Sequence, residues 1–405
     1  MILSIAWKNI WRNKLRSLIV IAATAIGVAA GTYSASLMFG VATQKIKAAI
    51  SNEVSHIQIH HPAFKENYEI QYTLPDAGKM ISDIEKLPGV KSVSGRTVIT
   101  GMILSAASAT GIKVNGINPE IEKKTTTLYT KIADTSGIYF GAGLRNPILI
   151  SQKIAEKLNV RLKSKIVLRF QSADGSLVEG AFKVCGIYRT SNGMFDEINV
   201  FVQQSDMIPL TGNLPIHEIA ILLHENDNVN QHVTSLRKEY PSTEVMDWQE
   251  LFPELGMLTA MLTTMNYMIL GIILAALAFG IVNTMLMIVL ERTRELGMLM
   301  AIGMNKGRLF RMIMLESILL SLCGGIAGII ISAFLIVLTA HTGIDLSSLG
   351  QGFEALGYDP VMYPEFRPGF FIGTVIMVIL TGILSALYPA RKALGINPAL
   401  AVKNE

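Results

Sequence analysis

Four long apolar runs constrain the fold of this chain more than any other feature of its sequence. They cover residues 17–44, 255–290, 317–340 and 369–390. Each run has the roughly 20 residues that a helix needs to cross a bilayer. Only 16% of the residues are charged, whereas soluble domains have about 25%. The sequence therefore predicts a membrane protein with four transmembrane helices, the second of which begins as a stalk outside the membrane.

The basic residues predict how these helices are oriented. They gather before the first run, between the second and third runs, and after the fourth: Lys8, Arg12, Lys14, Arg16, Arg292, Arg294, Lys306, Arg308, Arg311, Arg391 and Lys392. Positive residues in short loops mark the cytoplasmic side of a membrane. We therefore expect both termini, the 291–316 loop and the 391–405 tail in the cytoplasm. Residues 45–254 and the 341–368 loop then lie outside.

Residues 1–16 read MILSIAWKNIWRNKLR and precede the first span. Their apolar residues recur every three or four positions among basic ones, as in a helix that lies in the membrane interface. A signal peptide is the alternative, but its apolar region has about 7–15 residues, and the run from 17 to 44 is longer. The sequence therefore favours an amphipathic interfacial helix followed by a retained span.

Residues 45–254 are long enough for a separate α+β domain. A strand-helix-strand pattern occurs at 54–60, 77–87 and 90–100, and again at 217–223, 229–239 and 243–247. Two such units around an insertion predict a split ferredoxin-like module. The insertion, about 104–210, has mostly strand-like segments and one clear helix at 151–158. The expected fold class is an α+β membrane protein with a large domain outside the membrane.

Small residues and methionines predict two further features of the spans. Gly27 with Gly31, and Gly324 with Gly328, form G-x-x-x-G patterns, which favour close packing of helices in membranes. Four methionines recur at helical spacing near the outer end of the second span: Met257, Met261, Met265 and Met268. Flexible thioethers suit adaptable apolar surfaces. Ordinary contact with lipid or with other helices is the simpler explanation for them.

The loop between the second and third spans holds a short apolar patch, Gly297-Met298-Leu299-Met300-Ala301-Ile302-Gly303, among charged residues. The patch is too short to cross a bilayer. One interpretation is that it lies flat among the lipid headgroups. The other is that it forms a short helix that docks into a groove on a cytoplasmic partner.

This loop resembles the signature of the FtsX/MacB/Lol permease family of ABC transporters. The similar elements are E-R-x-R-E-L-G-M-x-x-A-I-G from residue 291 and Y-P-A-R-x-A followed by N-P-x-x-A from residue 388. The resemblance implies that the loop is a coupling helix seated on an ATPase. It assigns coupling to Glu291, Arg292, Arg294, Glu295, Gly297, Met298, Leu299, Ala301, Ile302 and Gly303. It also implies a MacB-like periplasmic domain with a porter module and a β-rich insertion.

The resemblance is closest to the lipoprotein-releasing permeases of this family. It implies a permease in a bacterial inner membrane that extracts lipoproteins for delivery to the outer membrane, with its methionines lining a cargo cavity. The expected partners are an ATPase dimer, a second permease subunit, membrane lipids and a periplasmic lipoprotein chaperone. The sequence has no G-x-x-x-x-G-K-[ST] motif. We therefore expect ATP and Mg²⁺ on a separate subunit and no cofactor on this chain.

Two alternatives remain open, and one feature departs from the lipoprotein-releasing type. The alternatives are MacB-like efflux of peptides or amphiphiles and FtsX-like signalling to a cell-wall hydrolase without transport. Some lipoprotein-releasing permeases have a long hook in the insertion that binds a chaperone, whereas here the matching link is only Ser172-Ala173-Asp174-Gly175-Ser176. The sequence shows no catalytic constellation. It also predicts no metal site: His60 and His61 are adjacent on an expected strand, so their side chains point to opposite faces and cannot readily share one ion.

Overall fold

The computed structural model describes the chain except for residues 1, 142, 191, 225–228, 346–360 and 396–405. The chain forms two compact units. Of the described residues, those in 2–43, 257–345 and 361–395 form the helical unit, and those in 44–256 form the α+β unit. The predicted fold class, four apolar helices plus a large α+β domain, is confirmed. Part of the predicted 341–368 loop and most of the 391–405 tail lie outside the described residues.

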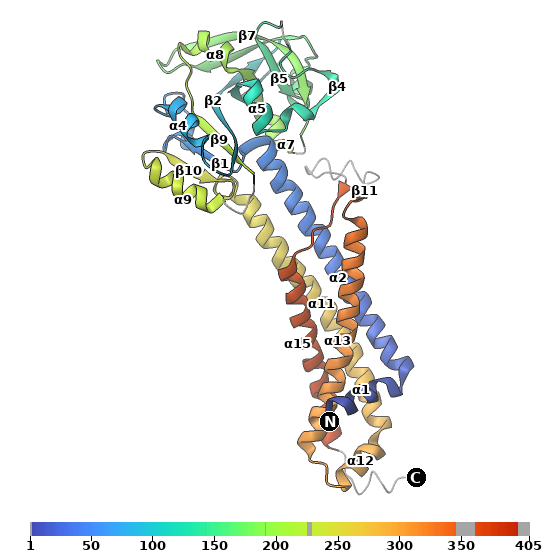
Figure 1. The fold of residues 1–405 in the computed structure, drawn as a ribbon. Coiled ribbons are helices and arrows are strands. Elements are labelled where there is room, and N and C mark those ends of the chain that lie inside the picture. The colour runs from blue at the N-terminus through green and yellow to red at the C-terminus, as the bar shows by residue number, and fades with distance from the viewer. Residues whose placement is uncertain (1, 142, 191, 225–228, 346–360, 396–405) are drawn as a thin grey trace. The chain divides into compact units, whose positions relative to one another are not determined.

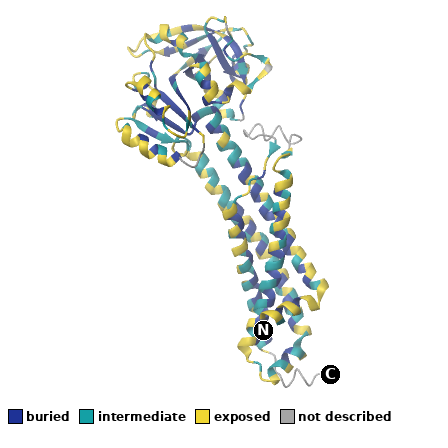
Figure 2. Ribbon diagram, viewed as in Figure 1, coloured by how far each residue is buried: buried dark blue, intermediate teal, exposed yellow. Residues whose placement is uncertain are grey.

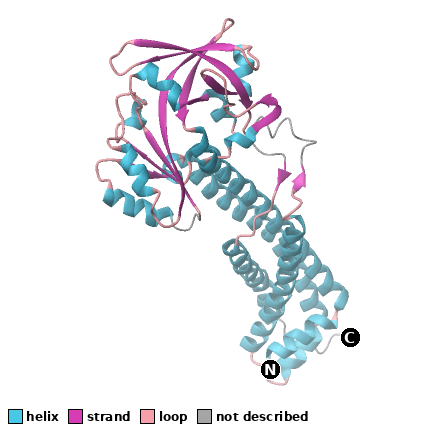
Figure 3. Ribbon diagram, turned by 45° about the horizontal axis from the view of Figure 1, so that its top comes forward, coloured by secondary structure: helices cyan, strands magenta, loops and turns pink. Residues whose placement is uncertain are grey.

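The helical unit is built on four helices that are long and apolar enough to cross a membrane. They are α2 (Lys14–Ala49), α11 (Pro253–Glu291), α13 (Lys306–Thr339) and α15 (Pro368–Leu394). The lower parts of the four lie side by side in Figures 1 and 3. A two-stranded ladder joins β11 (Ile344–Asp345) to β12 (Val361–Met362) between α13 and α15.

These helices extend beyond the predicted apolar runs. Helix α13 begins at Lys306 rather than near residue 317, because the Asn305 side chain accepts a hydrogen bond from the Gly307 amide and caps it. Helix α2 continues past residue 44 to Ala49, and a π-helix, η1 (Ile50–Val54), follows it. The strand expected at 54–60 is therefore shorter. Hydropathy marks the apolar centre of a helix but not its polar ends.

Helix α2 packs closely against two other helices through glycines. A Cβ atom on Gly27 would lie 2.9 Å from Leu277 Cδ1 of α11. On α13, a Cβ on Gly324 would lie 2.6 Å from Thr24 Cβ, and one on Gly328 would lie 2.6 Å from the Ala25 carbonyl oxygen of α2. Such distances leave no room for a side chain. The G-x-x-x-G pattern of α2 thus faces α11, and the G-x-x-x-G pattern of α13 faces α2.

We expect Gly328→Val to destabilise the helical unit by about 1–3 kcal/mol, because the added side chain would push α13 away from α2. The matched control is Gly280→Ala on α11, where an added Cβ meets nothing within 4 Å. Thermal unfolding in detergent measures both variants. Equal melting temperatures for Gly328→Val and Gly280→Ala would contradict the close packing of α2 and α13.

The first sheet of the α+β unit contains β1 (Ile57–His60), β2 (Val90–Leu104), β9 (Glu218–Leu223) and β10 (Glu244–Asp247). Its strand order is β10-β1-β9-β2, and all neighbours are antiparallel. Helices α4 (Ala77–Ile84) and α9 (Val229–Glu239) connect the strands and contribute to the same apolar core. This is the ferredoxin-like arrangement that the two strand-helix-strand patterns predict.

The insertion forms a closed barrel with the second half of β2. Its other strands are β3 (Ala109–Ile117), β5 (Pro147–Ser151), β6 (Lys165–Gln171), β7 (Leu177–Tyr188) and β8 (Asn199–Gln203). The pairings β2-β3, β3-β8, β8-β5, β5-β7, β7-β6 and β6-β2 complete a ring. Buried aliphatic side chains fill its interior, and much of the ribbon of these strands has the colour of buried residues in Figure 2. Strand β2 is shared, because Val90–Arg96 pair with β9 and the residues after Arg96 pair with β3.

Shorter elements surround these two sheets. They are α3 (Phe64–Asn67), α5 (Pro119–Thr125), η2 (Leu128–Lys131), β4 (Ile132–Gly137), α6 (Gln152–Leu158), α7 (Gly193–Ile198), α8 (Gln204–Thr211) and α10 (Trp248–Leu251). The connection between β6 and β7 is a tight turn, in which the Ser172 amide donates to the Ser176 carbonyl over 2.8 Å. The structure therefore has no long hook at this link.

Candidate functional site: the coupling region

The apolar patch of the 291–316 loop forms a separate short helix, α12 (Thr293–Ala301). Its two faces have different surroundings. Leu296 is only 2% exposed and packs into a core with Val289, Leu309 and Ile313. Met298 is 49% exposed and Ile302, just after the helix, is 85% exposed. Helix α12 is thus held in the helical unit by one face and presents apolar side chains on the other.

Gly303 ends this helix in a way that requires glycine. Its φ is +99°, a backbone conformation that side chains with a Cβ rarely adopt. The Gly303 amide donates to the Met300 carbonyl and the Met304 amide donates to the Leu299 carbonyl. This pair of hydrogen bonds is a Schellman motif, which satisfies carbonyls at a helix end. Gly303 therefore turns the chain sharply from α12 toward α13.

The N-terminal helix α1 (Ile2–Arg12) packs against the same region (Figure 1). Ala6 and Ile10 are 0% and 4% exposed, and Ile10 belongs to the core that contains Leu296. Trp7 and Trp11 are exposed on another side, with ring centroids 6.0 Å apart. The helix ends at Arg12, before the predicted limit at residue 16, because α2 already begins at Lys14.

Two ion pairs connect the N-terminal segment to α12 and to the end of α11. Arg12 pairs with Glu295 of α12, and Arg16 pairs with Glu291 at the end of α11. The Arg12 hydrogen bonds, together with Arg292, lower the pKa of Glu295 to about 2. The contribution of this carboxylate is therefore fully present above its ordinary value of 4.5 and is lost as pH falls toward 2. Both pairs are partly solvated, so each is individually weak.

A third contact in this region is buried. The Glu316 side chain of α13 is 5% exposed. Its Oε1 accepts a hydrogen bond from Asn9 Nδ2 of α1 over 2.5 Å and lies 3.5 Å from Arg292 Nη1. Arg292 also bonds to Glu295 of α12 over 3.0 Å. Glu316 thus connects α1, α12 and α13 at one point.

We expect Glu316→Ala to destabilise the helical unit by about 1–3 kcal/mol, because it leaves the half-buried Asn9 and Arg292 donors without this acceptor. The control is Glu316→Gln, which keeps an acceptor oxygen for Asn9 and should lower the stability of the helical unit much less. Thermal unfolding in detergent compares the two. Identical losses for both variants would mean that the hydrogen bonds contribute little.

The structure brings most of the predicted coupling residues together on or beside α12. Glu291, Arg292 and Glu295 form the contacts to α1, α2 and α13, whereas Met298 and Ile302 face outward. Sequence reasoning missed Asn9, Arg12, Arg16 and Glu316 as members of this site. In the sequence, these residues stand out only as polar side chains next to apolar runs. That pattern does not identify their partners, which are hundreds of positions away in the chain.

The predicted cargo-facing methionines lie on the helical unit, along α11. Met257, Met261 and Met268 are 74%, 62% and 58% exposed, and Met265 is half-buried. They thus form an apolar stripe that is accessible in the single chain. That they line a cargo cavity stays a prediction.

Comparison with family models matches two parts of the chain. Residues 17–239, more than half of the chain, match the MacB-like periplasmic core domain. Residues 267–398 match the FtsX-like permease C-terminal domain. The second match includes α12, α13 and the Y-P-A-R segment of α15.

Several curated proteins are similar to this chain. An uncharacterized ABC transporter permease, YknZ of Bacillus subtilis (strain 168), is 25% identical over 99% of this chain and 98% of its own length. The macrolide export ATP-binding/permease protein MacB of Vibrio parahaemolyticus is 29% identical over 53% of this chain. The pyoverdine export ATP-binding/permease protein PvdT of Pseudomonas entomophila is 25% identical over the whole chain. The chain covers 31% of that MacB and 59% of that PvdT.

Two solved structures are similar to part of this chain. The extracellular domain of the noncanonic ABC-type transporter YknZ is 17% identical, with a TM-score of 0.34, and covers 47% of this chain and 99% of its own. The periplasmic region of MacB from Actinobacillus actinomycetemcomitans is 12% identical, with a TM-score of 0.34, and covers 47% of this chain and 87% of its own. On the family-model matches, the chain belongs to the FtsX/MacB family of ABC transporter permeases.

Proposed function

We propose that this chain is a permease subunit that transmits force from a separate ATPase to its α+β unit. The observation that carries the proposal is the exposed apolar face of α12, formed by Met298 and Ile302. An apolar helix face in a cytoplasmic loop is suited to dock in a groove of a partner. The other face of α12 is fixed to the helical unit by Leu296 and by the ion pair with Arg12.

In this proposal, the partner is a cytoplasmic ATPase dimer that binds ATP and Mg²⁺. Closure of the dimer on ATP would displace α12. Because α11 is one helix from Pro253 to Glu291, a displacement at its lower end would pass along it to the α+β unit. Two permease chains, identical or related, would face one another in a bacterial inner membrane. Both termini and α12 would be cytoplasmic, as the positive residues indicate.

The proposed cargo is lipid-anchored. In the lipoprotein-releasing type that the sequence resembles, cargo enters between the first two spans from the outer leaflet. The exposed methionines of α11 would contact its acyl chains, and a periplasmic chaperone would receive it. A second candidate is export of small amphiphiles, which the names of the MacB and PvdT relatives favour. The short β6–β7 turn, without a hook, also suits this second candidate.

Purification from native membranes in mild detergent, followed by mass spectrometry, tests the function. Co-purified lipoproteins together with a P-loop ATPase would support lipoprotein release. Co-purification of an ATPase with an adaptor and an outer-membrane channel would instead support efflux and would argue against lipoprotein release. A peptidoglycan hydrolase without any cargo would overturn transport and would indicate that the α+β unit acts as a lever.

A further inference from the structure

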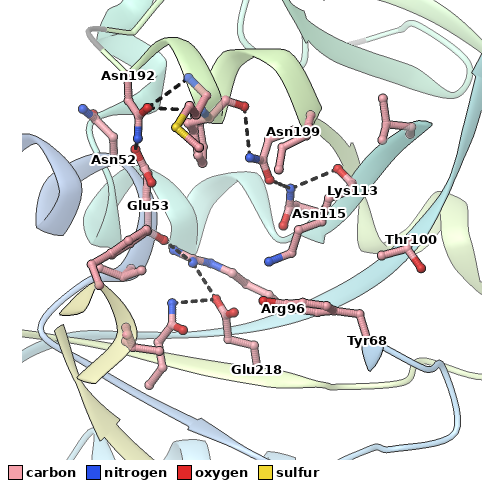
Figure 4. A pocket seen from close by; sticks show the side chains of 18 of the residues that line it. Asn52, Glu53, Tyr68, Arg96, Thr100, Lys113, Asn115, Asn192, Asn199 and Glu218 are labelled. Carbon is pink, nitrogen blue, oxygen red and sulfur yellow. Dashed lines mark hydrogen bonds and ion pairs between the residues drawn. The ribbon is translucent and has the colours of Figure 1, made fainter. Parts of the chain in front are cut away.

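The α+β unit contains a cavity of about 510 Å³ where strand β2 passes from the ferredoxin-like sheet into the barrel. A volume of this size is typical of a small-molecule site. The cavity is lined from both parts of the unit: by Gln58, Arg96 and Glu218 of the ferredoxin-like sheet, and by Lys113, Asn115 and Asn199 of the barrel. Figure 4 labels five of these side chains around the cavity: Arg96, Glu218, Lys113, Asn115 and Asn199.

The alternation of strand residues explains why polar groups reach the cavity. On β3, Ile112 and Val114 point into the barrel core, so Lys113 and Asn115 point outward. On the neighbouring strand β8, Val200 points into the core, and Asn199 pairs with Lys113 in the ladder. Asn115 Nδ2 donates to Asn199 Oδ1 over 3.0 Å. The barrel thus presents a fixed polar face with a lysine beside it.

Two of the three carboxylates that line the cavity, Glu53 and Glu218, are already engaged by other residues; the third, Glu254, acts on Lys65 through its charge but forms no ion pair with it within 4.0 Å. Arg96 binds Glu122 and Glu218, each over 2.7 Å. Glu218 also accepts from Gln58 over 3.1 Å, and Glu53 accepts from Asn192 over 2.7 Å. These carboxylates are thus bound by other side chains of the α+β unit. These contacts leave no described carboxylate of the cavity lining in an ion pair with its lysines.

Lys113 and Lys65 are therefore unusual. Neither has a carboxylate oxygen within 4.0 Å among the residues that the structure describes. The Lys113 ammonium lies over the Tyr68 ring, 4.5 Å from its centroid. Burial lowers the pKa of both lysines, and the nearby carboxylates, Glu218 foremost, offset this lowering only in part. Two half-buried ammonium groups at a cavity form a site for an oxyanion.

Part of the cavity lining is apolar and partly accessible. This apolar wall consists of Met194, Phe195, Ile198, Leu251 and Phe252. Met194 is 80% exposed and Ile198 is 48% exposed. Exposed apolar side chains beside unpaired cations suit a ligand that has both an anionic and an apolar part.

We propose that this cavity binds a small anionic amphiphile, whose carboxylate or phosphate group contacts Lys113 and Lys65 and whose apolar part contacts the apolar wall. The proposal concerns binding to the α+β unit alone. It does not depend on the cargo or on coupling to an ATPase, so it can fail while the proposed function holds.

The test is isothermal titration calorimetry of the full chain in lipid nanodiscs, with empty nanodiscs subtracted. Short probes limit partition into the lipid: hexanoate, hexyl phosphate, inorganic phosphate and hexanol. We expect saturable binding of hexanoate or hexyl phosphate, at least about tenfold tighter than that of the other two probes, because each of those lacks one of the two groups. The tighter of the two amphiphiles identifies the headgroup.

The variants are Lys113→Met, Lys65→Met and, as a matched control, Lys165→Met at an exposed position of β6. Lys113→Met removes a desolvated charge, so it should fold, and thermal unfolding verifies this. We expect at least about a tenfold loss of affinity for Lys113→Met, a loss for Lys65→Met and no change for the control. Absence of binding by both amphiphiles, or equal affinity of wild type and both cavity variants, would overturn the proposal. Inorganic phosphate binding as tightly as hexyl phosphate would also overturn it.

Discussion

Replacing Met298 with aspartate is expected to abolish stimulation of the partner ATPase without unfolding the chain. Met298 is 49% exposed on α12, so a carboxylate there stays solvated in the free permease. In the docked complex the same carboxylate would be buried in an apolar groove, at a cost of several kcal/mol. Measurement of ATP hydrolysis by the co-expressed complex should show stimulation reduced by at least about tenfold.

The matched control for this variant is Leu177→Asp. Leu177 is 74% exposed at the start of β7, in the α+β unit, and has no proposed role in coupling. Both variants should retain the melting temperature of the wild type. Undiminished stimulation in Met298→Asp would rule out docking through α12, and equal loss in both variants would indicate a general effect of added charge.

Arg96→Met is expected to destabilise the α+β unit by about 3–5 kcal/mol at neutral pH, because it leaves two buried carboxylates without their cation. Arg96 is 5% exposed, and its partners Glu122 and Glu218 are 1% and 5% exposed. Thermal unfolding in detergent measures the loss. Arg169→Met is the control, because Arg169 pairs with Glu179 at the surface, where one pair contributes less than about 1 kcal/mol.

The pH dependence of this variant provides a second test. Burial alone would raise the pKa of Glu218, but the His60 hydrogen bond and the Arg96 charge lower it below its ordinary value of 4.5. In the wild type, this stabilisation is therefore present above pH 4.5 and is lost as pH falls further. Without Arg96, the effect of burial on Glu218 is opposed less strongly, so the Glu218 carboxylate becomes protonated at a higher pH than in the wild type. The difference in stability between wild type and variant should narrow on acidification, and a constant difference would contradict the buried-charge explanation.

The elements with strong periodicity could be predicted from the sequence. Helix α9 occupies the predicted residues 229–239, and the four apolar runs lie within the four long helices except for Ala340, which directly follows α13. The two strand-helix-strand patterns predicted the ferredoxin-like sheet, because alternating residues in each strand must face one core. Even there, local patterns missed the ends: residues 50–54 form a π-helix where a strand was expected to begin.

The contacts that define the candidate site could not be predicted. Glu316 and Asn9 are 307 positions apart, and Arg12 and Glu295 are 283 apart. Periodicity describes one element at a time and does not identify which elements meet. The barrel is a similar case, because its closure depends on pairing of β6 with both β2 and β7. The cavity at Lys113 then follows from that closure, since an outward lysine on an isolated strand would be solvated.

The most direct test of mechanical coupling places a photocrosslinking amino acid at Ile302, which is 85% exposed beside α12. Irradiation of native membranes, followed by mass spectrometry of the crosslinked product, identifies what contacts this position. The account predicts a product that contains a P-loop ATPase, and no such product from the same amino acid at Leu177. Crosslinks to lipid alone would contradict the account and would show that the apolar face of α12 lies among the headgroups.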